Sequence, residues 1–220
     1  MTGTSVLAVT YKGGVALTAD TLGSYGKMSR FWNMSRLRPI STNTLLGASG
    51  DISDFQSVLD DLERARVEDV CAEDGAFLST SEISSWLSRV TYQRRNKMNF
   101  LWNTFVVAGV TEKNEAYLSV VDKLGTSYQE KFAATGFGAH LALPLLRERW
   151  NPNLTKDEAK KLLEDCMRVL YYRDCRTINR IQFGTLLCVY CSRENINHTD
   201  IFTGTGWGGP SLDHSIHFHR

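Results

Sequence analysis

The sequence predicts an α+β fold in which helices cover the outer faces of antiparallel sheets. Expected strands and helices come in segregated runs: strands, two helices, strands, two helices and strands again. That order argues against β-α-β winding and favours helices packed outside antiparallel sheets. The chain has 220 residues, 42% of them hydrophobic and 22% charged, a mix and a length that permit a substantial core. With no repeat and no linker, we expect one domain followed by a Gly-rich tail.

The first elements expected are strands. Residues 6–10 and 15–19 are apolar and β-branched, and Lys12-Gly13-Gly14 joins them. Paired glycines supply the positive φ of a tight turn, so this stretch predicts a hairpin. Residues 25–40 are polar and irregular, which indicates a loop with short strands, and residues 44–49 predict a further strand that ends at Gly50.

Two helices should follow, the first from about Asp54 and the second from about Ser81, because apolar residues recur at helical spacing in both. A second hairpin is expected from residues 102–110 and 116–122, with its turn around residues 112–114.

The last third of the chain predicts two more helices and two strands. A third helix is expected over residues 135–150. A fourth should begin at Thr155, because Thr155 and Glu158 have the spacing of a capping box. Strands are expected at residues 181–190 and 200–203.

Composition excludes several classes of function. A formal charge of +1 provides no basic field for nucleic acid. No apolar run is long enough for a membrane helix, and we expect no signal peptide. The odd number of cysteines, without framework spacing, favours reduced thiols; they are Cys71, Cys166, Cys175, Cys188 and Cys191.

Three motifs could bind a metal or a nucleotide, but each has a simpler interpretation. Cys188-x-x-Cys191 lacks a second pair, so buried strand cysteines are favoured over zinc or redox chemistry. The histidines at positions 214, 217 and 219 are more typical of a draped tail than of a metal site. The glycines from Gly204 onward do not open a helix after a strand, so a phosphate loop is disfavoured. We therefore expect no cofactor and no metal.

The residues Gly3-Thr4, with Asp20 at the end of the second expected strand, could be a nucleophile and its support, or a strand start and a turn. Threonine becomes a nucleophile when its own free α-amino group serves as the base. A peptide bond at that nitrogen removes the base. The site also needs a cation that can pass protons and a backbone N–H as oxyanion donor.

Gly3-Thr4 with the following hairpin, Asp20, Gly47-Ala48-Ser49-Gly50-Asp51 and Tyr171-Tyr172-Arg173-Asp174 together resemble the β subunits of the 20S proteasome. The resemblance runs from Thr2 to about Tyr190. Finer features resemble one non-catalytic type of that family: "GTSVLAV", "LGSYG", "NMSRLRPI", "LLGASGD", "LWNTFVV", "ATGFGAHLA", "PLLRE" and "CMRVLYYRD".

The resemblance implies a role for several positions. Thr4 falls where the catalytic threonine would be, and Gly3 precedes the processing cut. Asp20 corresponds to the aspartate that orients the cation, and Gly50 to the oxyanion glycine. Asp174 also agrees with the family pattern.

Other positions depart from that pattern. The essential lysine is replaced by Arg36 and one supporting serine by Ala139. The second serine is Thr177, followed by Ile178 instead of glycine. Arginine stays charged where lysine can shift its pKa and exchange protons, and an alanine methyl donates no hydrogen bond. Residues 1–3 also make the Thr4 nitrogen an amide. We therefore interpret these positions as a degenerate, non-catalytic site.

The resemblance further implies the four-layer αββα sandwich of N-terminal nucleophile hydrolases, with residues 1–203 as the domain and 204–220 as a tail for contacts between subunits. Expected partners are other β subunits of the same ring and of the opposite β ring, and α subunits, without nucleic acid or membrane. The expected location is cytoplasm and nucleus. Four aromatic residues are candidate interface anchors, although Trp102 could equally be core: Phe31, Trp32, Phe100 and Trp102.

Two alternatives remain at this point. The first is a threonine protease activated by cleavage between Gly3 and Thr4. The second is an unrelated soluble binding protein.

Overall fold

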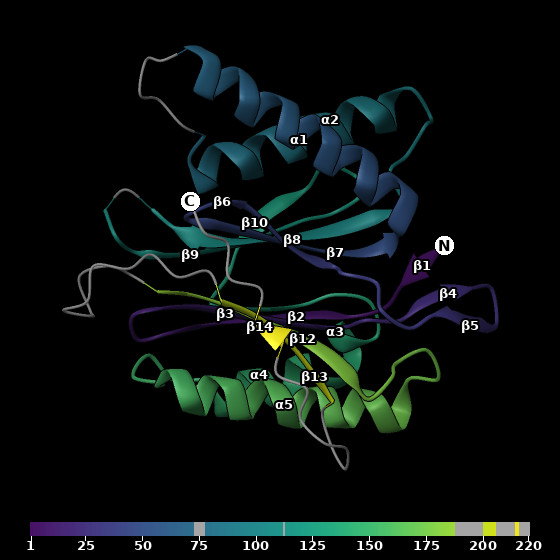
Figure 1. Ribbon diagram of the computed structural model, residues 1–220. Helices are drawn as coiled ribbons and strands as arrows, with labels where there is room; N and C mark the ends of the chain where they lie inside the picture. Colours follow the sequence, from purple (N-terminus) through teal and green to yellow (C-terminus); the bar gives the residue numbers. More distant parts are fainter. Residues whose placement is uncertain (73–77, 112, 188–199, 206–213, 216–220) are drawn as a thin grey trace.

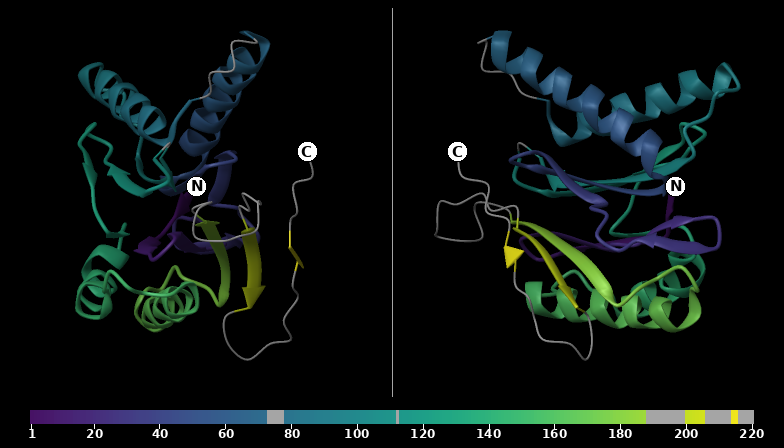
Figure 2. Two further views of the ribbon diagram at one scale, coloured as in Figure 1. Left: turned by 90° about the vertical axis from the view of Figure 1, so that its left-hand side faces the viewer. Right: turned by 45° about the vertical axis from the view of Figure 1, so that its right-hand side comes forward.

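The computed structural model describes residues 1–72, 78–111, 113–187, 200–205 and 214–215. In this part of the chain two antiparallel sheets lie face to face, and helices cover both outer faces (Figure 1). The two further views in Figure 2 show the same order of layers, with α1 and α2 on one side of the sheets and α5 on the other. The expected four-layer αββα sandwich is confirmed.

Sheet A, as described, has eight strands in the order β10-β9-β8-β7-β1-β4-β5, with β6 paired to β7. Its short strand β1 lies between β7 and β4, although β4 follows β1 by some twenty residues in the chain. The strands are β1 (Thr2–Gly3), β4 (Gly23–Tyr25), β5 (Met28–Phe31), β6 (Leu37–Ser41), β7 (Thr44–Asp51), β8 (Asn103–Val110), β9 (Ala116–Val121) and β10 (Ser127–Gln129).

Sheet B has six strands among the described residues, in the order β11-β2-β3-β12-β13-β14. These are β2 (Val6–Tyr11), β3 (Gly14–Asp20), β11 (Phe132–Ala134), β12 (Arg180–Leu187), β13 (Asp200–Thr205) and β14 (His214–Ser215). Both predicted hairpins, β2–β3 and β8–β9, are confirmed. In the first turn only Gly13 has a positive φ, because Gly14 already belongs to β3.

Five helices are seen in the described part: α1 (Ile52–Ala72), α2 (Thr80–Asn96), α3 (Gly138–Leu141), α4 (Leu143–Arg149) and α5 (Lys156–Arg173). The predicted capping box of Thr155 and Glu158 starts α5, and Ser79 with Glu82 starts α2 in the same way. The single helix expected over residues 135–150 is wrong. It is two helices that meet at Ala142, and Pro144 lies in the first turn of α4, a position where proline's missing N–H is tolerated.

Three apolar clusters fill the spaces between the four layers. One lies between sheet B and its helices, one between the sheets, and one between sheet A and its helices. Strand β2 serves two of them, because Leu7 and Val9 face α5 while Val6 and Ala8 face sheet A, as the twofold periodicity of a strand requires. This alternation sets the orientation of β2, and Thr4 and Ser5 lie directly before that strand.

Several expectations from the sequence concern the C-terminal region. Residues Cys188, Cys191, His217 and His219 lie outside the described residues, as do Glu112, Gly206, Gly208 and Gly209. Residues 204 and 205 of the expected tail belong to β13, and β14 pairs with β13.

Candidate functional site

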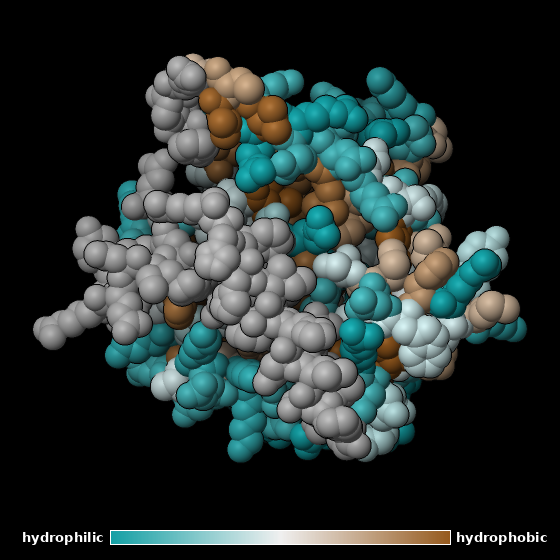
Figure 3. Space-filling model, in the orientation of Figure 1, coloured by the Kyte–Doolittle hydropathy of each residue, from teal (hydrophilic) through white to brown (hydrophobic). Residues whose placement is uncertain are grey.

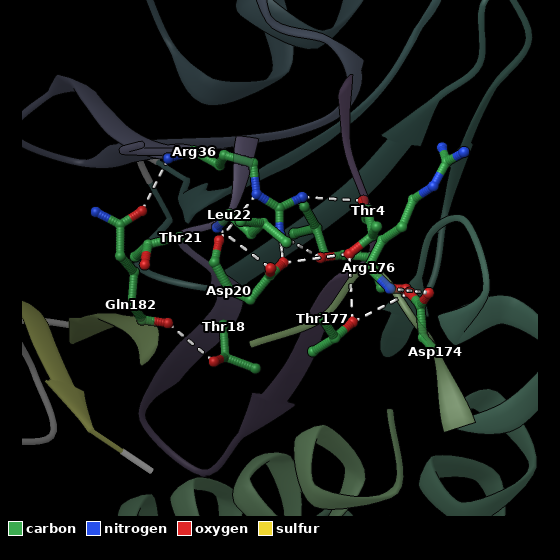
Figure 4. A network of polar contacts seen from close by, with 12 residues as sticks. Thr4, Thr18, Asp20, Thr21, Leu22, Arg36, Asp174, Arg176, Thr177 and Gln182 are labelled. Carbon is green, nitrogen blue, oxygen red and sulfur yellow. Dashed lines mark hydrogen bonds and ion pairs between the residues drawn. The ribbon is translucent and has the colours of Figure 1, made fainter. Parts of the chain in front are cut away.

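Thr4 lies between β1 and β2, and its hydroxyl contacts two of the residues expected at the site. Its Oγ1 donates a hydrogen bond to Oδ1 of Asp20 at 3.2 Å and lies 3.5 Å from Oγ1 of Thr177 (Figure 4). Asp20 comes from the end of β3 and Thr177 from the loop after α5. The fold thus brings together positions that the sequence separates by up to 173 residues.

Arg36 is buried beside them, with 1% of its side chain exposed. Its Nε donates to the carbonyl oxygen of Asp20 at 2.9 Å, Nη1 to that of Thr4 at 2.9 Å, and Nη2 to that of Ser5 at 3.0 Å. Nη2 also forms an ion pair with Oδ1 of Asp20. The guanidinium therefore holds the start of β2 against the end of β3.

Gly3 makes room for this arrangement. A Cβ atom at Gly3 would lie 2.5 Å from Cδ of Arg36, closer than any real side chain packs. The residue expected to precede a processing cut is thus also the residue that lets the arginine side chain reach the site.

Asp20 is fully buried. Its second carboxylate oxygen accepts a hydrogen bond from the backbone N–H of Leu22 at 3.3 Å. Burial raises the pKa of Asp20 above its ordinary value, while the positive charge of Arg36 and the hydrogen bonds from Leu22 and Thr4 oppose that shift. The fixed guanidinium is what lets a carboxylate occupy this dry position.

Asp174 closes the far side of the network. It is buried at the C-terminal end of α5, and it accepts hydrogen bonds from the hydroxyl of Thr177 at 3.1 Å and the backbone N–H of Arg176 at 3.0 Å. A continuous series of polar side-chain contacts therefore links Asp174 to Arg36. It passes through Thr177, Thr4 and Asp20.

Ala139 lies in α3, next to Gly138, whose N–H donates to Oγ of Ser5 at 2.8 Å. The methyl of Ala139 can neither accept nor donate a hydrogen bond, unlike the serine expected at this position. The hydroxyl of Ser5 is thus used to hold α3 against the start of β2.

Gly50 lies at the end of β7, directly opposite Gly3 of β1. Its φ of +96° and its contact with the carbonyl of Trp102 leave no space for a side chain. Nδ2 of Asn103 donates to the carbonyls of Ser49 at 3.1 Å and Asp51 at 2.7 Å, and so fixes the backbone on both sides of this glycine.

A cleft of about 450 Å³ borders these residues. Its lining includes Thr2, Thr4, Gly50, Trp102, Lys123 and Phe137. Nζ of Lys123 lies 4.5 Å from the centre of the Trp102 ring, a cation–π geometry. Trp102 is 62% exposed, so the interpretation of this residue as core is wrong.

The arrangement places the hydroxyl of Thr4 beside the carboxylate of Asp20. The Thr4 nitrogen is an amide in the peptide bond with Gly3, and the nearest cation is a guanidinium fixed by carbonyl oxygens. Among the described residues, no three His, Cys, Asp or Glu side chains gather where they could hold a metal. No helix in that part of the chain is both long and apolar enough to cross a membrane.

Sequence reasoning missed Gln182 and Ser5. Oε1 of Gln182 accepts the backbone N–H of Arg36 at 2.8 Å, and Nε2 donates to Oγ of Ser35 at 3.0 Å. Gln182 reaches this place through the pairing of β12 with β3, in which it lies opposite Ala19. A polar residue in the middle of a buried strand was the available signal.

With the geometry in place, comparisons with known proteins define the class. A family model described as proteasome subunit matches residues 1–186, and the chain belongs to that family; its αββα sandwich is the family's N-terminal nucleophile hydrolase fold.

The relatives named proteasome subunit beta type-4 confirm the expected resemblance. Over 188 residues the chain is 48% identical to the Xenopus laevis protein, with 84% of this chain and 77% of that one covered. It is 46% identical to the protein of the same name from Arabidopsis thaliana, with 84% and 75% covered. A Saccharomyces cerevisiae protein named proteasome subunit beta type-7 is 45% identical, with 80% and 70% covered.

Proposed function

We propose that this chain is a non-catalytic structural β subunit of the proteasome core, at the seventh position of the β ring. It would build the ring and help to join the two half-particles. The observation that carries the catalytic part of the proposal is the state of Arg36. Its guanidinium is fixed by three backbone carbonyls and one carboxylate.

A cation in that state cannot replace the lysine of an active subunit. A lysine at this place can release a proton when its surroundings lower its pKa, whereas guanidinium remains protonated across the physiological range. Ala139 leaves a second gap, since no hydroxyl is present there to join the hydrogen-bond network. The family's threonine protease chemistry would therefore be lost at this subunit, within a particle whose other subunits cut peptides.

Partners and location belong to the same proposal. The chain would contact other β subunits of its own ring and of the opposite ring, and α subunits, in cytoplasm and nucleus. Residues 1–203 would be the domain, and residues 204–220 would serve contacts between subunits. The aromatic side chains of Phe31, Trp32 and Trp102 are exposed in the single chain, which supports their expected role as anchors at such contacts.

N-terminal sequencing and intact mass of the chain from native particles test the proposal, together with labelling by a peptide epoxyketone that reacts with N-terminal threonine. We expect a chain that starts before Thr4 and carries no label. A chain that starts at Thr4 and is labelled there would establish the alternative, a threonine protease activated by cleavage between Gly3 and Thr4. That alternative is favoured by one observation, the retained hydrogen bond from Thr4 to Asp20.

A further inference from the structure

The cleft beside Thr4 has two aromatic side chains in its lining, Trp102 and Phe137. Their exposed fractions are 62% and 58%, so both rings are accessible to a ligand. The cleft volume of about 450 Å³ lies within the range of small-ligand sites, roughly 300–1,000 Å³. In the space-filling view, brown and pale atoms gather on the side of the molecule where the N-terminus lies (Figure 3), and Thr2 and Gly3 belong to the cleft lining. The cleft therefore has the size and the apolar surface to bind an organic ligand.

The charges that line the cleft are unbalanced. Lys123 and Arg176 are its cations and Asp122 is its carboxylate, and Oδ1 of Asp122 accepts the backbone N–H of Lys123 at 2.7 Å. In the described part of the chain, neither Lys123 nor Arg176 forms an ion pair. Figure 4 shows the side chain of Arg176 extending away from Asp174 and Thr177. Two cations without a carboxylate partner favour an anionic ligand.

The aromatic rings restrict the kind of anion. Nζ of Lys123 lies 4.5 Å from the centre of the Trp102 ring, so the ammonium group stands beside an apolar face. A carboxylate bound to Lys123 or Arg176 by charge-assisted hydrogen bonds would place its own apolar substituent against Trp102 or Phe137. A strongly hydrated inorganic anion would leave both rings without a partner. The lining therefore suits an organic carboxylate with an apolar side chain.

Hydroxyl groups supply further polar surface in the cleft. A hydroxyl both donates and accepts a hydrogen bond, so it can pair with the N–H or the C=O of an amide. The hydroxyl side chains in the lining are those of Thr2, Thr4, Ser49 and Thr104. A carboxylate, an apolar side chain and amide groups occur together at the C-terminal end of a peptide. Such a ligand would use the cations, the rings and the hydroxyls at once.

We infer that this cleft binds short peptides by a free C-terminal carboxylate, with an apolar last residue packed against Trp102 and Phe137. The inference rests on the proposed function, because hydrolysis at other subunits would supply such ligands: each cut adds water across an amide bond and leaves one fragment with a new carboxylate. This chain would hold these products without reacting with them, since binding requires no free amine at Thr4. Trp102 then serves the cleft, whereas Phe31 and Trp32 remain the anchors expected between subunits.

Photolabelling of purified native particles tests the inference, after a peptide epoxyketone has blocked the subunits that react with it. The probe is acetyl-Gly-Ala-benzoylphenylalanine with a free carboxylate, and the matched control probe ends in a carboxamide. Peptide mapping then locates the label. We expect label on this chain, in a peptide that contains Trp102 or Phe137, and at least fivefold more of it from the carboxylate than from the carboxamide.

Two double variants test the role of the cations. Lys123→Gln/Arg176→Gln removes both positive charges of the cleft, and labelling by the carboxylate should fall to the level of the carboxamide. The matched control is Lys113→Gln/Lys161→Gln, which removes two exposed lysines, one in the turn between β8 and β9 and one on α5. Labelling of the control should stay within twofold of wild type. All variants are compared inside purified particles, so each chain measured has folded and assembled.

Competition separates a peptide site from a general anion site. Unlabelled acetyl-Gly-Ala-Phe should displace the probe, and inorganic phosphate at the same concentration should not. Equal labelling by the two probes, displacement by phosphate, or labelling that survives Lys123→Gln/Arg176→Gln would overturn the inference while leaving the proposed function intact. Absence of the wild-type chain from all particles would overturn both.

Discussion

Arg36 and Asp20 form an ion pair in which neither side chain is exposed by more than 1%. Such a pair is expensive to form, because both charges leave water, and it is more expensive still to break on one side. Here the remaining hydrogen bonds of the guanidinium go to backbone carbonyls of Thr4, Ser5 and Asp20. The pair therefore connects the residues just before β2 to the end of β3.

Replacement of Arg36 by Met should destabilise the chain by about 3–5 kcal/mol, because it leaves the Asp20 carboxylate buried without its cation. The double variant Asp20→Asn/Arg36→Met should be more stable than Arg36→Met alone, since it removes both charges. Urea unfolding of four proteins, the wild type, Asp20→Asn, Arg36→Met and the double variant, gives the coupling energy. Additive effects of the two substitutions would contradict a direct coupling of these charges.

Restoring the family's residues at two positions should not activate the full chain. In Arg36→Lys/Ala139→Ser, the Thr4 nitrogen is still an amide, so the threonine has no base. We expect no labelling by a peptide epoxyketone when residues 1–3 are present. Labelling should rise when the same variant is produced with Thr4 as its first residue.

The matched control for this experiment is Thr4→Ala in the shortened double variant, which should abolish any label. Equal labelling of the long and short forms would refute the requirement for a free amine, unless mass analysis finds that the long form has been cut before Thr4.

The cysteines should differ sharply in reactivity. Burial raises the pKa of the Cys166 thiol to about 12, and only a thiolate reacts readily with alkylating agents. Cys71 and Cys175 are exposed. Peptide mapping after brief iodoacetamide treatment at pH 8 should find label at Cys71 and Cys175, and at Cys166 only after unfolding in urea. Early label at Cys166 in the folded chain would show that α5 opens far more readily than its packing implies.

The capping box of α5 should contribute to stability in a pH-dependent way. Hydrogen bonds from the backbone N–H and hydroxyl of Thr155 lower the pKa of Glu158 below its ordinary value of 4.5. Because the unfolded chain binds this proton more readily, the contribution is complete above pH 4.5 and is lost as the pH falls through the lower folded value. Glu158→Gln should reduce the dependence of the unfolding free energy on pH in this range.

Glu148→Gln serves as the control, because it removes an exposed carboxylate from α4, outside any capping box. It should leave the acid-dependent loss of stability nearly unchanged. If both variants behave alike, the box does not carry the effect.

Local patterns predicted most elements of this fold, because each strand and helix shows its own periodicity. The β2–β3 hairpin was visible in paired glycines, and the start of α5 in Thr155 and Glu158. The break between α3 and α4 was missed, although Pro144 marks it, because apolar residues continue across Ala142. The short strands of residues 23–31 carry too few residues for a periodicity, and their bulge depends on pairing that no local pattern encodes.

The resemblance named the site positions in sequence, but it gave none of their contacts. Thr4, Asp20, Arg36 and Thr177 do meet in the fold. The carbonyl partners of Arg36 and the amide of Gln182 depend on how β12 pairs with β3 and on the entry of the chain into β2. Those are properties of tertiary structure, and residue types and spacings alone do not report them.

The position of β1 has a mechanical consequence. Among the described residues, Thr2 and Gly3 form the strand that joins β4 and β5 to β7 within sheet A. A cut between Gly3 and Thr4 would separate this connecting strand from the rest of the domain, so that it could leave its place between β7 and β4. The peptide bond before Thr4 would then act as a latch. While it is intact, β4 and β5 are part of one continuous sheet, and once it is broken they would lose the strand that pairs them with β7.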